Sequence, residues 1–161
     1  YGLNVSAGRA RGLAAGAAAT ALVSLALYGV LQAADGVGLK HAVDAWAAAP
    51  AAEKAARFAS AETMRWLEWA ARGYHAFVLG LALLLYAGAI MGTGRLPRGL
   101  GAVLGLCGLA YWVQGWVVSA EGFSPANSLP TLLTIVLFLA GSLWLLIWLL
   151  RGKDARAALP N

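Results

Sequence analysis

The C-terminal part of the chain contains the apolar sequence LPTLLTIVLFLAGSLWLLIWLL, residues 129–150, which carries no charged side chain. An α-helix needs about 20 such residues to cross the hydrocarbon core of a bilayer. Three further apolar stretches of similar length cover residues 12–33, 73–91 and 99–119. They lack the alternation of barrel strands, so we expect helices, which satisfy their backbone groups internally. The sequence therefore predicts an all-α polytopic membrane protein with four transmembrane helices in a bundle.

The composition excludes several other classes of protein. Of the 161 residues, 61% are hydrophobic and 12% are charged, about half the usual charged share of a soluble domain. These values exclude a disordered chain, a collagen-like chain and an ordinary soluble enzyme. The length predicts a single membrane domain over residues 1–161. Cys107 is the only cysteine, which excludes an intrachain disulfide and a cysteine-rich zinc or iron–sulfur site.

Charged residues are unevenly divided among the segments that flank the four spans. The N-terminal segment, residues 92–98 and the tail after residue 150 together carry seven basic residues and one acid, whereas the other two connections carry five basic residues and six acids. Because basic residues in short loops stay in the cytoplasm, we expect both termini to be cytoplasmic. The net charge of +5 then reflects membrane topology, so the expected partner is the lipid bilayer and not nucleic acid.

Two basic residues, Arg9 and Arg11, precede the first span, as they would in a secretory signal peptide. The apolar run that follows is longer than the usual ~7–15 residues of a signal peptide. We therefore expect this segment to be retained as the first membrane helix, over residues 12–33.

The connection between the first two spans, residues 35–61, is expected to lie outside. The glycines in residues 36–38 are expected to break the first helix. Apolar side chains then recur at i, i+4 and i+7, which predicts a short amphipathic helix lying on the membrane surface: Leu39, Val43 and Trp46. Ser60 is the predicted N-cap of the second membrane helix, residues 62–91, which projects above the bilayer. The third and fourth helices are predicted at residues 99–119 and 129–150.

Polar side chains gather at the ends of the spans that are expected to lie outside. On the second helix, four of them fall at offsets of 3, 7 and 10, which places them on one face: Arg65, Glu68, Arg72 and His75. Glu68 and Arg72 are expected to form an i, i+4 ion pair. Polar residues at membrane depth usually face a cavity or the bundle interior, so we predict a ligand-binding pocket lined by Asp35, Glu68, Arg72, His75, Gln114 and Glu121. The alternative is a hydrogen-bond network that fixes helix order.

His75 admits several roles. It could bind haem, a chlorophyll-type pigment or a metal, alone or with His41, relay protons, or simply hydrogen-bond a neighbour. A nucleophilic triad of Ser119, His75 and Asp35 can also be written, although no nucleophile-elbow sequence accompanies it. The chain has no CxxCH, HExxH or CxxC motif. We therefore assign no catalytic residue and no metal ligand, and we name no cofactor.

Two segments in the middle of the chain resemble a known family. Residues 65–69 read RWLEW, and residues 94–101 read GRLPRGLG, a basic turn between two membrane helices. This pattern resembles the DUF4386-type family of multi-helix bacterial membrane proteins, over residues 20–125. The resemblance implies a bacterial cytoplasmic (inner) membrane protein, and the family provides no catalytic residues to transfer.

Four functions are compatible with these features. The favoured hypothesis is a small ligand-binding or accessory membrane protein with a polar pocket at the outer interface. The second is a structural subunit of a larger membrane complex or homo-oligomer, with small-residue stripes such as Gly101 and Gly105 against partner helices and haem or pigment contacted through His75. The third, a membrane enzyme with Glu68 and His75 as acid and base, is less favoured, as is a transporter.

Overall fold

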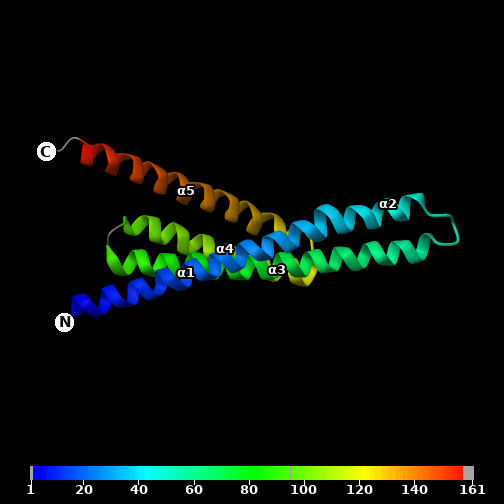
Figure 1. Cartoon of the computed structure of the whole chain (residues 1–161), viewed down its shortest axis with the longest axis horizontal. Helices are drawn as coiled ribbons and strands as arrows, with labels where there is room; N and C mark the ends of the chain where they lie inside the picture. The colour runs from blue at the N-terminus through cyan, green and yellow to red at the C-terminus, as the bar shows by residue number, and fades with distance from the viewer. Residues whose placement is uncertain (1, 95, 158–161) are drawn as a thin grey trace.

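The computed structural model describes residues 2–94 and 96–157, and every regular element within them is helical (Figure 1). The four long helices are α1 (Gly2–Gln32), α3 (Lys54–Thr93), α4 (Arg98–Glu121) and α5 (Ser128–Ala157). Between them lie a π-helical segment (Ala33–Leu39), the short helix α2 (Lys40–Ala48) and a 3-10 turn (Pro125–Asn127). Four helical stretches are long and apolar enough to cross a membrane. The predicted all-α bundle of four membrane-length helices, with a short helix between the first two, is confirmed.

The first helix does not break at its glycines, so that part of the prediction is wrong. α1, the π-helical segment and α2 follow one another without interruption, and Gly36 and Gly38 lie within the π-helical segment. A π-helical turn widens the helix and rotates the residues that follow it without ending the rod. At Gly38 the helix passes so close to α3 that a Cβ atom would collide with the end of the Met64 side chain.

Both helical rods are about twice as long as a membrane span requires. α3 has 40 residues and the rod Gly8–Ala48 has 41, so each is about 60 Å long, against a hydrocarbon core of about 30 Å. α2 and the first part of α3 run side by side beyond the ends of α4 and α5 (Figure 1). We call this extension, residues 40–67, the arm. The predicted helix on the membrane surface is therefore wrong, because α2 continues the axis of α1 and packs on α3.

The tip of the arm is fixed by Lys54. Its Nζ atom donates to the carbonyl oxygens of Trp46 and Ala47, both at 2.9 Å, which satisfies two carbonyls at the C-terminal end of α2. The same ammonium lies 5.0 Å from the centre of the Trp46 ring, which also packs against Phe58. Lys54 is the first residue of α3. The N-cap predicted at Ser60 is therefore wrong, because the helix begins six residues earlier. Ser60 lies inside the helix and donates to the carbonyl of Ala56.

Glycines bring α3 and α4 into backbone contact. A Cβ atom on Gly80 would lie 2.7 Å from the carbonyl oxygen of Gly108, and a Cβ on Gly108 would lie 2.7 Å from the carbonyl oxygen of Gly80. Further along the same helix pair, a Cβ atom on Gly115 would lie 3.1 Å from the carbonyl oxygen of Gly73. Trp112 closes over this crossing and donates from its indole to the carbonyl of Phe77 at 3.0 Å. Small residues at these positions are what permits such a close helix pair.

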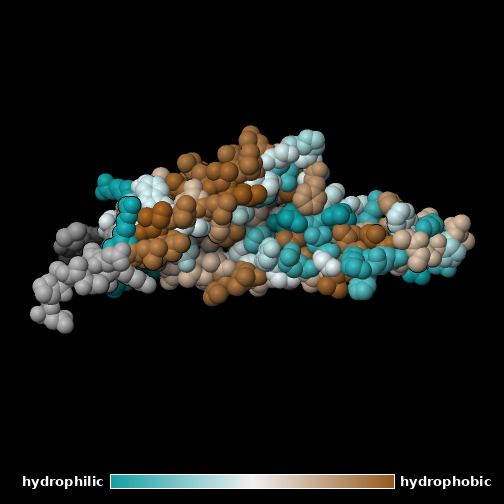
Figure 2. Space-filling model, turned by 90° about the horizontal axis from the view of Figure 1, so that it is seen from above, coloured by the Kyte–Doolittle hydropathy of each residue, from teal (hydrophilic) through white to brown (hydrophobic). Residues whose placement is uncertain are grey.

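The helices pack in the spatial order α1, α3, α4, α5. α3 contacts α1 on one side and α4 on the other, and α5 packs on α4, while in the described part of the chain α1 and α5 do not touch. The bundle is therefore open between its first and last helices (Figure 1). The most hydrophobic side chains gather over the half that contains α4 and α5, and hydrophilic ones are frequent on the arm half (Figure 2).

Candidate functional site

Four charged side chains meet where the arm leaves the bundle. Glu68 is wholly buried, and its carboxylate contacts Arg65 at 3.3 Å and Arg72 at 2.7 Å, one turn away on either side of it along α3. Asp35, in the π-helical segment, reaches the same two guanidiniums at 3.8 and 3.9 Å. The expected pairing of Glu68 with Arg72 is confirmed, and Arg65 joins it. This ion-pair cluster of Asp35, Arg65, Glu68 and Arg72 has no net charge.

The position of the cluster along α3 explains how charges are tolerated there. Glu68 lies 25 residues before Thr93, the last residue of α3, which corresponds to about 38 Å along the helix axis. This distance exceeds the hydrocarbon thickness of about 30 Å when the opposite end of the helix sits at the membrane surface. The arginine and aspartate side chains are partly exposed, whereas Glu68 is enclosed.

An aromatic ring covers the cluster from the connection between α4 and α5. Phe123 lies 4.9 Å from the guanidinium carbon of Arg72 and 5.9 Å from that of Arg65, both within cation–π range. Phe123 in turn packs edge-on against Trp69 at 6.5 Å. This is possible because Gly122, with φ of +66°, presses its backbone on the Trp69 ring, where a Cβ atom would collide. Phe123 was not predicted as part of the site. Its position directly after a turn glycine is the only signal for it in the sequence.

His75 lies apart from the cluster and faces α1. Its Nδ1 atom is 3.0 Å from the hydroxyl oxygen of Ser24 and 3.1 Å from the Ser24 carbonyl oxygen, and its ring packs at 5.3 Å from that of Tyr28. His75 thus ties α3 to α1. The triad with Ser119 and Asp35 is not assembled, because Ser119 packs against Gly73 and Asp35 belongs to the cluster. His41, on the arm, is exposed.

The other two predicted site residues also make separate contacts. Gln114 of α4 donates its amide to the hydroxyl of Thr131 on α5 at 3.0 Å, and Glu121 accepts from the hydroxyl of Ser124 at 2.8 Å near the surface. The six predicted residues therefore divide among separate contacts: Asp35, Glu68 and Arg72 in the cluster, His75 against α1, Gln114 against α5, and Glu121 in the α4–α5 connection. The structure therefore does not bring the six side chains into mutual contact, because His75 and Gln114 contact different neighbouring helices.

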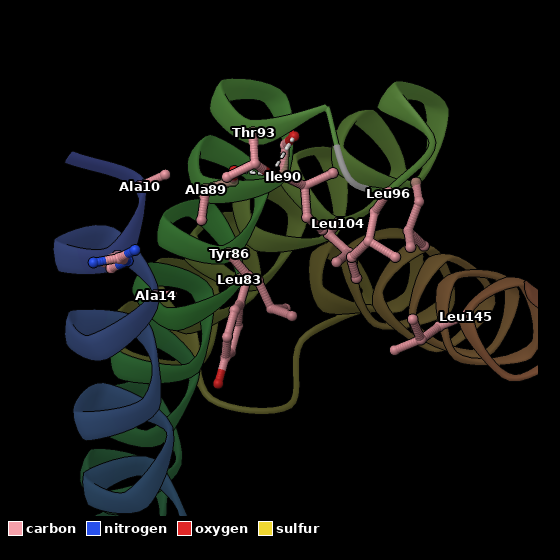
Figure 3. A pocket seen from close by; sticks show the side chains of 12 residues that line it. Ala10, Ala14, Leu83, Tyr86, Ala89, Ile90, Thr93, Leu96, Leu104 and Leu145 are labelled. Atoms are coloured by element: carbon pink, nitrogen blue, oxygen red, sulfur yellow. Dashed lines mark hydrogen bonds between the residues drawn. The ribbon is translucent and has the colours of Figure 1, made fainter. Parts of the chain in front are cut away.

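Two cavities of the described chain lie elsewhere. An aromatic groove of about 520 Å³ runs between α3 and α4, lined by Trp66, Trp69, Ala70, Tyr74, Phe77, Trp116, Ser119 and Ala120. A second cavity of about 540 Å³ lies at the end of the bundle away from the arm, and its lining is almost entirely apolar. We call it the apolar cavity; its residues come from α1, α3, the α3–α4 connection, α4 and α5 (Figure 3). Among the described residues, His, Cys, Asp and Glu do not gather in a group of three that would suit a metal ion.

The fold and these contacts define an all-α bundle with four helices of membrane-spanning length and a two-helix arm that extends beyond α4 and α5. No protein-family model, curated protein or solved structure matches the chain.

Proposed function

We propose that this chain is a small accessory protein of the bacterial cytoplasmic membrane, whose arm contacts another protein outside the membrane. The length of α1–α2 and α3 supports this most directly, because residues beyond the cluster are not needed to cross a bilayer. Apolar side chains remain exposed on or beside the arm, among them Val37, Val43, Phe58 and Leu67. Exposed apolar surface outside the bilayer is typical of a protein contact.

The cluster gives the arm a firm base. Asp35 comes from the first rod, Arg65, Glu68 and Arg72 come from the second, and Phe123 comes from the α4–α5 connection. Ion pairs and cation–π contacts between these elements favour one relative position of the two rods and the α4–α5 connection. A partner that binds the arm is then held at a set height above the membrane.

The same geometry speaks against acid–base catalysis by Glu68 and His75. One oxygen of Glu68 contacts Arg72 and the other contacts Arg65, and the side chain is wholly buried. A carboxylate that is enclosed in this way has no access to a substrate, which a general base requires. His75 is two turns further along the same face of α3 and contacts Ser24 of α1.

The proposed orientation has the arm outside and both termini in the cytoplasm. The N-terminus, the α3–α4 connection and the C-terminus lie together at the end away from the arm (Figure 1). These are the segments that hold seven of the twelve basic residues and one of the seven acids. Such a bias is what retains loops on the cytoplasmic side.

Photocrosslinking in intact cells tests the arm. A photoreactive phenylalanine analogue at Val43, which is exposed on α2, is expected to give an adduct with a second protein of defined mass. Val136, equally a valine and exposed on α5, is the matched control and should crosslink to lipid. The Glu68→Gln change should weaken the Val43 adduct, because it loosens the base of the arm. If Val43 yields only lipid adducts, as Val136 does, the arm is not a contact surface and the proposal is wrong.

A further inference from the structure

The apolar cavity has the composition of a site for a lipid chain. Its lining comes from four helices and the α3–α4 connection: Ala10, Arg11 and Ala14 of α1; Leu83, Tyr86, Ala89, Ile90 and Thr93 of α3; Leu96; Leu100 and Leu104 of α4; and Leu145 of α5. Its volume of about 540 Å³ lies within the range of about 300–1,000 Å³ that ligand pockets have. The hydroxyl of Thr93 is already bonded to the carbonyl of Ala89 at 3.0 Å. The walls therefore offer mainly hydrocarbon.

The open side of the bundle gives this cavity access to the bilayer. α1 and α5 both contribute to its lining, yet in the described chain they do not contact each other. Figure 3 shows Leu83 and Tyr86 projecting from α3 into the space between α1 and Leu145 of α5. A molecule already in the membrane could enter between α1 and α5 without crossing water.

A single cation stands among the lining residues. Arg11 lies in the first part of α1, on the end of the bundle that also holds Arg9, Arg98 and Arg151. A long arginine side chain near a helix end keeps its guanidinium at the membrane surface. Basic pockets between membrane helices on the basic side of a protein suit anionic lipid head groups. Arg11 therefore stands where a headgroup would lie when its chain fills the cavity.

We propose that the apolar cavity binds one anionic diacyl phospholipid from the adjoining leaflet, with an acyl chain between α1 and α5 and the headgroup phosphate on Arg11. The bidentate guanidinium favours a phosphodiester that carries a net negative charge over a zwitterionic headgroup. This inference depends on the membrane location of the bundle and not on the function proposed for the arm.

Native mass spectrometry of the full chain in detergent tests it, with equimolar dioleoyl phosphatidylglycerol and dioleoyl phosphatidylcholine added. The wild-type protein should retain the anionic lipid at least fivefold better than the zwitterionic one. Arg11→Gln should remove that preference, because the charge is lost at an exposed position. Ala14→Phe should reduce retention of both lipids at least fivefold, because the new ring occupies the cavity. Leu145→Trp narrows the same cavity from α5 and replaces Ala14→Phe if that variant folds poorly.

Matched controls separate a built site from general attraction. Arg9→Gln removes the same charge at the same end, but Arg9 lines a separate hollow of about 160 Å³ with Leu13 and Gly92. Ala15→Phe adds the same ring at a neighbouring exposed position outside the cavity lining. Both controls should retain the anionic lipid as the wild type does. Equal losses for Arg9→Gln and Arg11→Gln, or unchanged binding by both cavity-filling variants, would overturn the proposal.

Discussion

Glu68 and Arg72 of α3 lie one helical turn apart, with the Nε and Nη2 atoms of Arg72 both 2.7 Å from a single oxygen of Glu68. The Glu68 side chain is 0% exposed, although carboxylates are rarely buried unless they are paired. Arg72 remains 29% exposed. The pair is therefore asymmetric, and removal of either partner has a different consequence.

The Glu68→Gln change should lower the free energy of unfolding by about 1–3 kcal/mol, since the two arginines that it leaves are partly exposed and Asp35 still lies within 4 Å of both. Arg72→Gln should cost more, about 3–5 kcal/mol, because it leaves the wholly buried Glu68 carboxylate with Arg65 alone, at 3.3 Å. The double variant should lose less than the sum of the two. A double-mutant cycle on reversible unfolding in detergent measures this coupling.

The arm provides the control pair for that cycle. Lys40 and Asp44 of α2 also stand at i, i+4, but their side chains are 66% and 58% exposed. Lys40→Gln and Asp44→Asn should each change stability little, and the cycle should show no measurable coupling between them. If the Glu68 and Arg72 effects are equally small and additive, the cluster does not hold the arm.

A second prediction concerns the crossing of α3 and α4. Gly80→Ala should lower the free energy of unfolding by about 1–3 kcal/mol, because the new Cβ would lie 2.7 Å from the carbonyl of Gly108 and the helices must separate. Gly12→Ala on α1 is the control, since nothing lies within 4 Å of a Cβ there. It should be neutral or stabilising by up to about 1 kcal/mol, because alanine favours the helix. Equal effects at both positions would mean that the crossing tolerates a methyl group.

Much of the fold could be predicted because a membrane-spanning helix requires about 20 consecutive apolar residues, which are visible in the sequence. The length of the apolar stretches predicts the four spans. Both ends of α4 and the C-terminal end of α3 lie within two residues of the predicted positions. The arm was harder to predict, because the glycines in residues 36–38 locally indicate the end of a helix. The structure keeps the rod continuous since α3 packs against it, which no local pattern records.

The site was predicted only where it depends on one helix. The spacing of Glu68 and Arg72 fixes their contact, and the 3.6-residue period brings Arg65 to the same carboxylate. Contacts between helices depend on the order in which helices pack, and four spans allow several orders. His75 therefore turned out to face Ser24, and Gln114 to face Thr131, because α1 packs on α3 and α5 packs on α4.

A third prediction tests the proposed orientation. Ala48→Cys at the end of α2 should react with a membrane-impermeant maleimide in intact cells, whereas Gly92→Cys near the end of α3 should react only after the cells are opened. Both positions are exposed, and the native Cys107 is buried, so it contributes little background. The physical reason is the retention of basic loops in the cytoplasm. Labelling of Gly92→Cys from outside would show that the topology is the reverse of the proposed one.

The last prediction concerns the two glycines with positive φ, which end α3 and α4. Gly94 has φ of 61° and ψ of 9°, the left-handed conformation common after a helix, and nothing lies within 4 Å of a Cβ there. Gly122 has φ of 66° and ψ of −140°, a region that only glycine adopts readily, and a Cβ there would collide with Trp69.

Gly94→Ala should therefore cost about 1–2 kcal/mol of unfolding free energy, the ordinary penalty of a left-handed residue. Gly122→Ala should cost at least about 2 kcal/mol, because backbone strain and the collision with Trp69 act together. It should also displace Phe123 from the arginines and so reduce the coupling measured between Glu68 and Arg72. Unfolding in detergent and the repeated cycle in the Gly122→Ala background measure both effects. Equal costs for the two alanine variants, with an unchanged coupling energy, would show that Phe123 does not help to hold the cluster.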